Sequence, residues 1–178
     1  MVNFSGEISG RLGAIAAEIM RDEQQHVALL RRLLGGYAIA KPTIDLNALG
    51  IGFDTFQQFL ELSRAFEDTG VSAYAGAAPL ITSQTNFGFV MRIGQVEALH
   101  SSNLRLIIAA NNVQTTALDS LDVLPPPSGN HYFETIAPAL SIIRNTSQVL
   151  SIVYGNSASG TSKGGFFPDG VNGAITTV

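Results

Sequence analysis

The sequence predicts an all-α fold in which three long helices form a bundle, followed by an irregular C-terminal segment rich in Gly and Pro. Apolar residues recur at steps of three and four over three long stretches before residue 112, which is the period of amphipathic helices. After that residue come three consecutive prolines, 125–127, and frequent glycines, which are typical of turns. A length of 178 residues fits one domain. We therefore expect a helical core over residues 1–112 and an extension over 113–178 that packs on the same domain.

The first helix is predicted to run from about Ser9 to Leu34. Gly35 and Gly36 follow it, and glycine commonly ends a helix because it adopts the left-handed conformation without strain. Steps of three and four place seven residues on one face. This stripe consists of Leu12, Ile15, Ile19, Glu23, His26, Leu30 and Leu33.

The second helix is predicted from an N-cap at Asp54 to about Ile81, after a linker over residues 37–52 that returns the chain along the bundle. Pro79 is expected to bend or close it. Its stripe consists of Phe56, Leu60, Ser63, Glu67, Val71 and Tyr74.

The third helix follows a Thr82-Ser83 cap and is predicted to reach about Asn112. Its stripe consists of Ile93, Glu97, His100, Leu104 and Ile107. In the C-terminal segment, Thr146 is predicted to be the N-cap of a short helix that runs through Val153.

The composition excludes several classes of protein. Only 13% of the residues are charged, about half the usual ~25% of soluble domains. The longest strictly apolar run, residues 73–81, is far shorter than the ~20 residues of a spanning helix, so we expect no membrane insertion. A net charge of -4 and scattered arginines argue against nucleic acid as a partner. The absence of Cys excludes disulfides and thiolate metal sites, and the first residues do not resemble a signal peptide.

Each of the three stripes carries an acidic residue where the period calls for an apolar one. A buried carboxylate needs a cation, a proton or a metal ion to compensate it. The arginines near the stripes are predicted to lie off them or at helix ends, so buried ion pairs are not expected to neutralise all three carboxylates. These arginines are Arg31, Arg32, Arg64 and Arg105.

In two of the stripes a His follows the Glu three residues later, a spacing that lets both side chains reach one ion. Chance predicts roughly 0.1 such pairs among three His, and the sequence has two. Carboxylate oxygen with imidazole nitrogen suits iron, manganese or zinc, and a bridging glutamate would make the site dinuclear. The predicted metal ligands are therefore Glu23, His26, Glu67, Glu97 and His100. The alternative for either pair alone is a hydrogen-bonded core histidine.

Two further polar residues lie close to these positions. Tyr74 is predicted to be a core aromatic residue, with a hydrogen-bonding or redox role as the alternative. Asp68 either hydrogen-bonds a ligand histidine or occupies a solvated helix position.

The motifs "MRDEQQHVALLRRLLGG", "AKPTIDL", "FLELSRAFEDTGVSAYAGAAPLI" and "VEALHSSNLRLIIA" resemble the ferritin-like domain of proteins related to the desiccation-related proteins. The segment "TSQVLSIVYGNSASGTSKGGFFPDGVNG" is similar to the tail that those proteins carry. The resemblance implies a ferritin-like four-helix bundle whose second, third and fourth helices are the three predicted here. It matches Glu23 and His26 to the second-helix Glu-x-x-His, Glu67 to the third-helix Glu, and Glu97 and His100 to the fourth-helix Glu-x-x-His.

The family's first helix, which carries another Glu ligand, has no counterpart in this sequence. We therefore expect the bundle to be completed by a homo-oligomer or by a complementing helical segment. The resemblance implies a di-iron or di-manganese cofactor, and the missing Glu leaves its presence open.

Two functions follow from the resemblance. The first is redox chemistry on dioxygen or peroxide at the dinuclear site. The second is a non-catalytic stress- or desiccation-related structural protein that self-assembles and retains a degenerate metal site. The resemblance favours an extracellular or periplasmic location, which is consistent with a secreted form of the second kind.

Overall fold

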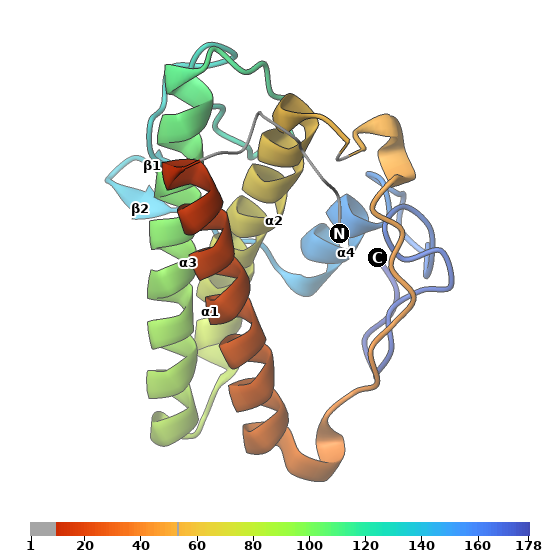
Figure 1. Ribbon diagram of the computed structural model, residues 1–178. Coiled ribbons are helices and arrows are strands. Elements are labelled where there is room, and N and C mark those ends of the chain that lie inside the picture. Colours follow the sequence, from red (N-terminus) through yellow and green to blue (C-terminus); the bar gives the residue numbers. More distant parts are fainter. Residues whose placement is uncertain (1–9, 53) are drawn as a thin grey trace.

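The computed structural model describes residues 10–52 and 54–178 and is dominated by helices (Figure 1). Three of them are long: α1 (Arg11–Leu34), α2 (Phe56–Ala77) and α3 (Gln84–Ala110). The short helix α4 (Thr146–Val153) and the two-residue strands β1 (Thr135–Ile136) and β2 (Leu140–Ser141) follow, and the strands pair antiparallel. The predicted all-α class is confirmed. Within the described residues, no helix is both long and apolar enough to cross a bilayer.

The helix starts correct two predictions. Thr55, not Asp54, is the N-cap of α2, because its side chain accepts a hydrogen bond from the Gln58 backbone while the Gln58 side chain accepts one from the Thr55 backbone. Asn145 makes the same capping box with Gln148, so Thr146 is the first helical residue of α4. Ser83 caps α3 as predicted. The predicted start of the first helix at Ser9 lies outside the described residues.

Helices α2 and α3 form the core, and α1 lies across them (Figure 1). A cluster of Leu60, Leu104, Ile108 and Val113 is almost fully buried, and Ile19 of α1 packs against it. Helix α1 is less well covered: among its described side chains none is fully buried. Its apolar residues Met20, Val27 and Leu34 are 55%, 56% and 50% exposed. Because they recur every seven residues, they form one partly exposed stripe along one side of the helix.

Three arginines and their carboxylate partners form a polar network inside the protein. Arg64 and Arg105 both donate to Oδ2 of Asp68, at 3.1 and 2.8 Å, and the Ser101 hydroxyl donates to its Oδ1 at 2.6 Å. Asp68, Arg64 and Arg105 have no exposed surface. Arg64 and Arg105 were predicted to lie off the apolar stripes or at helix ends, and they are nevertheless fully buried; neither interpretation of Asp68 holds. The arginines pair with Asp68 and, for Arg64, with Asp122, so they still do not neutralise the stripe glutamates.

The same network attaches the segment after α3 to the helices. Arg144 donates to both carboxylate oxygens of Asp119 at 2.8 Å and to the Ser72 hydroxyl at 2.9 Å. Arg144 holds the pKa of Asp119 below its ordinary value. Glu134 lies 3.4 Å from Arg144, and burial raises the pKa of Glu134 to about 8. The hydrogen bonds from Arg144 to Ser72 and the ion pair between Arg64 and Asp122 therefore fasten this segment to α2.

The segment after α3 packs tightly against Gly76 of α2. A Cβ at this position would collide with the carbonyl oxygen of Arg144. We expect Gly76→Ala to lower the free energy of unfolding by about 1–3 kcal/mol through overpacking. The matched control is Gly88→Ala in α3, where nothing lies within 4 Å and the better helix former is expected to add about 0.5–1 kcal/mol. Urea denaturation of both variants measures the difference, and equal effects would contradict the close approach.

Candidate metal centre

The five predicted ligands meet where α1, α2 and α3 come together. One ligand atom from each of Glu23, Glu67, Glu97 and His100 lies within 4.8 Å of the others. His26 lies beside this group, with its Nδ1 3.2 Å from Oε1 of Glu23 and 3.1 Å from Oε1 of Glu97. The two imidazole rings are 6.4 Å apart between centroids. The stripes on three helices therefore converge on one cluster.

The cluster is closed on one side and open on another. Glu67, Glu97 and His100 are 7%, 5% and 7% exposed, because α2 and α3 pack directly against each other there. The side chain of Glu23 on α1 is 41% exposed. Small molecules therefore have access to the cluster beside Glu23.

Four atoms of the cluster are buried without a hydrogen-bond partner: Oε1 of Glu23, Nδ1 of His26, Oε2 of Glu67 and Nδ1 of His100. His100 Nδ1 lies 3.3 Å from Oε2 of Glu67 and 3.4 Å from Oε1 of Glu23, at ion-pair distance but without hydrogen-bond geometry. Buried polar atoms normally find partners, so atoms left without one indicate a missing ligand. A cation among these oxygens and nitrogens would satisfy all four.

Protons compensate the charge of the cluster when no cation is bound. Burial, with the neighbouring Glu67 and Glu23, raises the pKa of Glu97 to about 9. For His100, burial alone would lower the pKa, but the carboxylates of Glu23, Glu67 and Asp22 outweigh it and raise the pKa to about 10. At neutral pH both residues therefore carry a proton that a metal ion would have to displace.

Two further residues of the site, Asp22 and Gly70, do not belong to the predicted apolar stripes. Nε2 of His100 lies 3.2 Å from Oδ2 of Asp22, and because an ionised carboxylate only accepts, the histidine donates. Asp22 is rotated by about 100° from Glu23, so helical period alone could not place it in the site. Gly70 is the other residue: a Cβ there would lie 3.1 Å from Oε2 of Glu97. A glycine inside a helix costs about 1 kcal/mol relative to alanine, so its presence in the sequence indicates that another group packs closely against the helix there.

A cavity of about 300 Å³ lies between α1 and α2 and reaches the cluster at Glu23 and Glu67. Its other walls are mostly apolar, including Ile15, Ile19 and Phe59. The cluster is thus bordered by a space with hydrocarbon walls and two carboxylates at its end.

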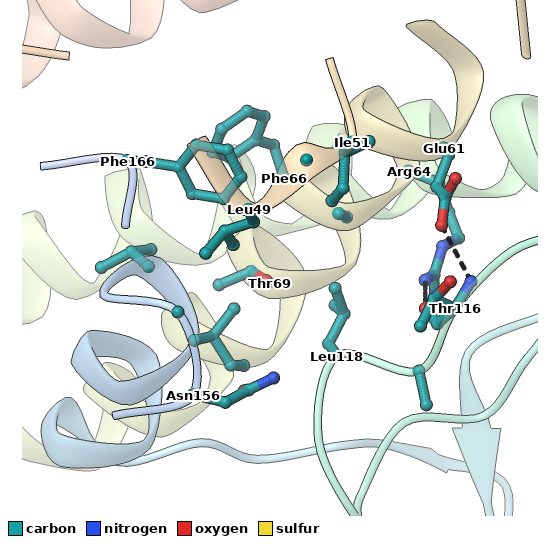
Figure 2. A pocket seen from close by; sticks show the side chains of 16 residues that line it. Leu49, Ile51, Glu61, Arg64, Phe66, Thr69, Thr116, Leu118, Asn156 and Phe166 are labelled. Atoms are coloured by element: carbon teal, nitrogen blue, oxygen red, sulfur yellow. Dashed lines mark hydrogen bonds between the residues drawn. The ribbon is translucent and has the colours of Figure 1, made fainter. Parts of the chain in front are cut away.

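A second cavity, of about 420 Å³, lies next to α2 and is drawn in Figure 2. Phe66 and Phe166 flank one end, and at the other end Arg64 and Glu61 bind the backbone of Thr116. None of the five candidate ligands lines it, so this cavity is separate from the cluster.

Comparison with known families agrees with the fold. The family model of the ferritin-like domain matches residues 3–110, which include α1, α2, α3 and all five candidate ligands. No curated protein and no solved structure matches the chain significantly. The match covers more than half of the sequence. The chain therefore belongs to the ferritin-like domain family.

Proposed function

We propose that the protein binds two transition-metal ions, iron or manganese, between α1, α2 and α3. The observation that carries the proposal is the convergence of four buried, unpartnered ligand atoms from Glu23, His26, Glu67 and His100. Glu97 supplies a further carboxylate within the same group. Carboxylate and imidazole donors without thiolate suit these metals better than softer ions.

The side chains of the chain have distinct roles in this proposal. Asp22 accepts a hydrogen bond from Nε2 of His100, so Nδ1 of His100 faces the cluster. Such a hydrogen bond fixes the tautomer of a ligand histidine. Gly70 leaves room for the carboxylate of Glu97. Glu23, the exposed member, borders the open side. Bound metal ions would supply redox chemistry toward dioxygen or peroxide.

Elemental analysis tests the proposal. Protein reconstituted with ferrous or manganous salt and desalted is expected to retain two equivalents of metal. His26→Ala and His100→Ala are each expected to lose metal, because each removes a nitrogen donor from the cluster. The matched control is His131→Ala: this histidine is exposed and lies in the segment after α3, so the variant should retain both equivalents. Wild-type protein without metal after reconstitution would refute the proposal.

The partly exposed apolar stripe of α1 favours a second, compatible candidate function. Met20, Val27 and Leu34 leave about half of their surface in water, and contiguous exposed apolar surface marks interaction sites. We propose that a second copy of the chain or a complementing helix covers this stripe. In a non-catalytic version of this candidate, the protein is a secreted, desiccation-related structural component that self-assembles and whose metal site is degenerate.

Sedimentation velocity tests the association. The wild type is expected to sediment as an oligomer, and Val27→Glu is expected to shift it toward the monomer because it places a charge in the middle of the stripe. Gln24→Glu introduces the same side chain at another exposed position of α1, one turn earlier, and serves as the control. A wild-type protein that is monomeric across all concentrations would contradict self-association.

A further inference from the structure

The phenol of Tyr74 lies on the same face of α2 as the candidate ligand Glu67 and makes no hydrogen bond within the described residues. Tyr74 lies two helical turns after Glu67 on α2, so the two side chains share a face. Its Cβ lies against α3 at Gly94, where an added Cβ would be 3.2 Å away. Gly94 is one turn before Glu97. The Cβ end of the Tyr74 side chain thus packs between α2 and α3, one helical turn from the candidate ligand Glu97.

The direction of helical side chains brings the phenol toward the cluster. Long side chains on a helix lean toward its N-terminus, over the preceding turn. For Tyr74 that turn contains Gly70, and Oε2 of Glu97 lies over Gly70. The side-chain direction therefore points the phenol toward Glu97.

Among the described residues, no hydrogen bond reaches the phenol oxygen of Tyr74. The buried Tyr154 shows the usual arrangement: its hydroxyl donates to the carbonyl of Thr176 at 3.0 Å and accepts from the backbone of Val171 at 3.2 Å. A buried phenol normally finds such partners. Tyr74 is only partly buried, and within the described residues its phenol oxygen, on the same helical face as Glu67, makes no such bonds.

We propose that Tyr74 is a further metal ligand of this chain, binding a ferric ion of the cluster through its phenolate oxygen. The inference rests on the proposed metal binding. On ligation the phenol O–H bond breaks, the oxygen–iron bond forms and the proton passes to solvent, so no oxidant or reductant is needed. The phenolate adds an oxygen donor to the ligands from three helices, and hard oxygen donors suit ferric iron.

Visible absorption and resonance Raman spectra of the full chain loaded with ferric nitrilotriacetate and desalted test the proposal. The wild type is expected to show a phenolate-to-iron charge-transfer band and the Raman ring modes of a coordinated phenolate. Tyr74→Phe should lose the band completely while still retaining iron by elemental analysis. Tyr154→Phe, the control, should keep it.

A second variant keeps the test decisive if Tyr74→Phe does not fold. The chain has four tyrosines, so replacing Tyr37, Tyr132 and Tyr154 by Phe leaves Tyr74 as the sole phenol, and the band should remain. Bound iron without the band in the wild type, or a band that survives in Tyr74→Phe, would overturn the inference. Failure of the wild type to retain iron would instead refute the proposed metal binding.

Discussion

Asp68→Ala is expected to lower the free energy of unfolding by about 3–5 kcal/mol, enough to unfold many single domains. Asp68 is fully buried and accepts hydrogen bonds from Arg64, Arg105 and Ser101. Its removal leaves two buried guanidinium groups facing each other without the carboxylate between them. Arg64 retains Asp122, but Arg105 retains only backbone carbonyl partners.

Urea denaturation followed by circular dichroism measures this effect. Asp68→Asn keeps the shape and removes the charge, so it separates the electrostatic part of the loss from the packing part. Asp169→Asn applies the same substitution at an exposed position and is expected to stay within about 0.5 kcal/mol of the wild type. If Asp68→Ala lost less than about 1 kcal/mol, the two arginines would have to be solvated in the folded protein, contrary to their burial.

Adding metal is expected to raise the free energy of unfolding by a similarly large amount. Two independent ions, each at about a hundredfold its dissociation constant, add about 2.7 kcal/mol apiece to the free energy of unfolding. The total of about 5 kcal/mol rivals the stability of a small domain. Differential scanning calorimetry with and without manganous salt measures it as a rise in melting temperature, which Glu67→Gln should abolish.

The increase in the free energy of unfolding on adding metal is expected to grow with pH. In the metal-free protein the pKa values of Glu97, Glu134 and His100 are raised, to about 9, 8 and 10. A raised pKa contributes stability that is complete below the unfolded value, 4.5 for Glu and 6.5 for His, and is lost as the pH rises through the folded value. Metal-free protein should therefore become less stable between about pH 5 and 10. Metal displaces the protons of Glu97 and His100, so it binds more tightly over the same interval.

Glu97→Gln is the control for this pH dependence. The amide resembles the protonated carboxyl in shape and charge, so the metal-free variant should lose less stability at high pH than the wild type. Because the amide is a poor metal ligand, added manganese should give it little stabilisation. A melting temperature that rises with pH in the metal-free wild type would contradict the assigned protonation states.

The sequence predicted the helices and the convergence of their stripes, because helical period places residues such as Glu67 and Val71 on one face whatever surrounds the helix. It did not predict the role of Asp68, which is rotated by about 100° from Glu67. That second side of α2 is also buried, because α3 and the segment after residue 112 both cover it. A single stripe cannot show that a helix is covered on two sides. Asp22 was missed for a related reason: its contact with His100 depends on how α1 crosses α3.

Because of the arginine network, we expect the unit that folds cooperatively to extend beyond the part of the chain that matches the family. The ferritin-like match ends at residue 110, yet Arg64 binds the carbonyl of Thr116 and Arg105 binds those of Val123 and His131. A fragment cut at the end of the match would retain all three long helices and Asp68, but it would lack Asp122 and the carbonyl groups that accept hydrogen bonds from Arg64 and Arg105. We therefore expect the boundary for expressing an autonomous domain to lie beyond the family boundary. We also expect that a minimal scaffold built from α1, α2 and α3 would need Arg64 and Arg105 redesigned as apolar residues together with Asp68.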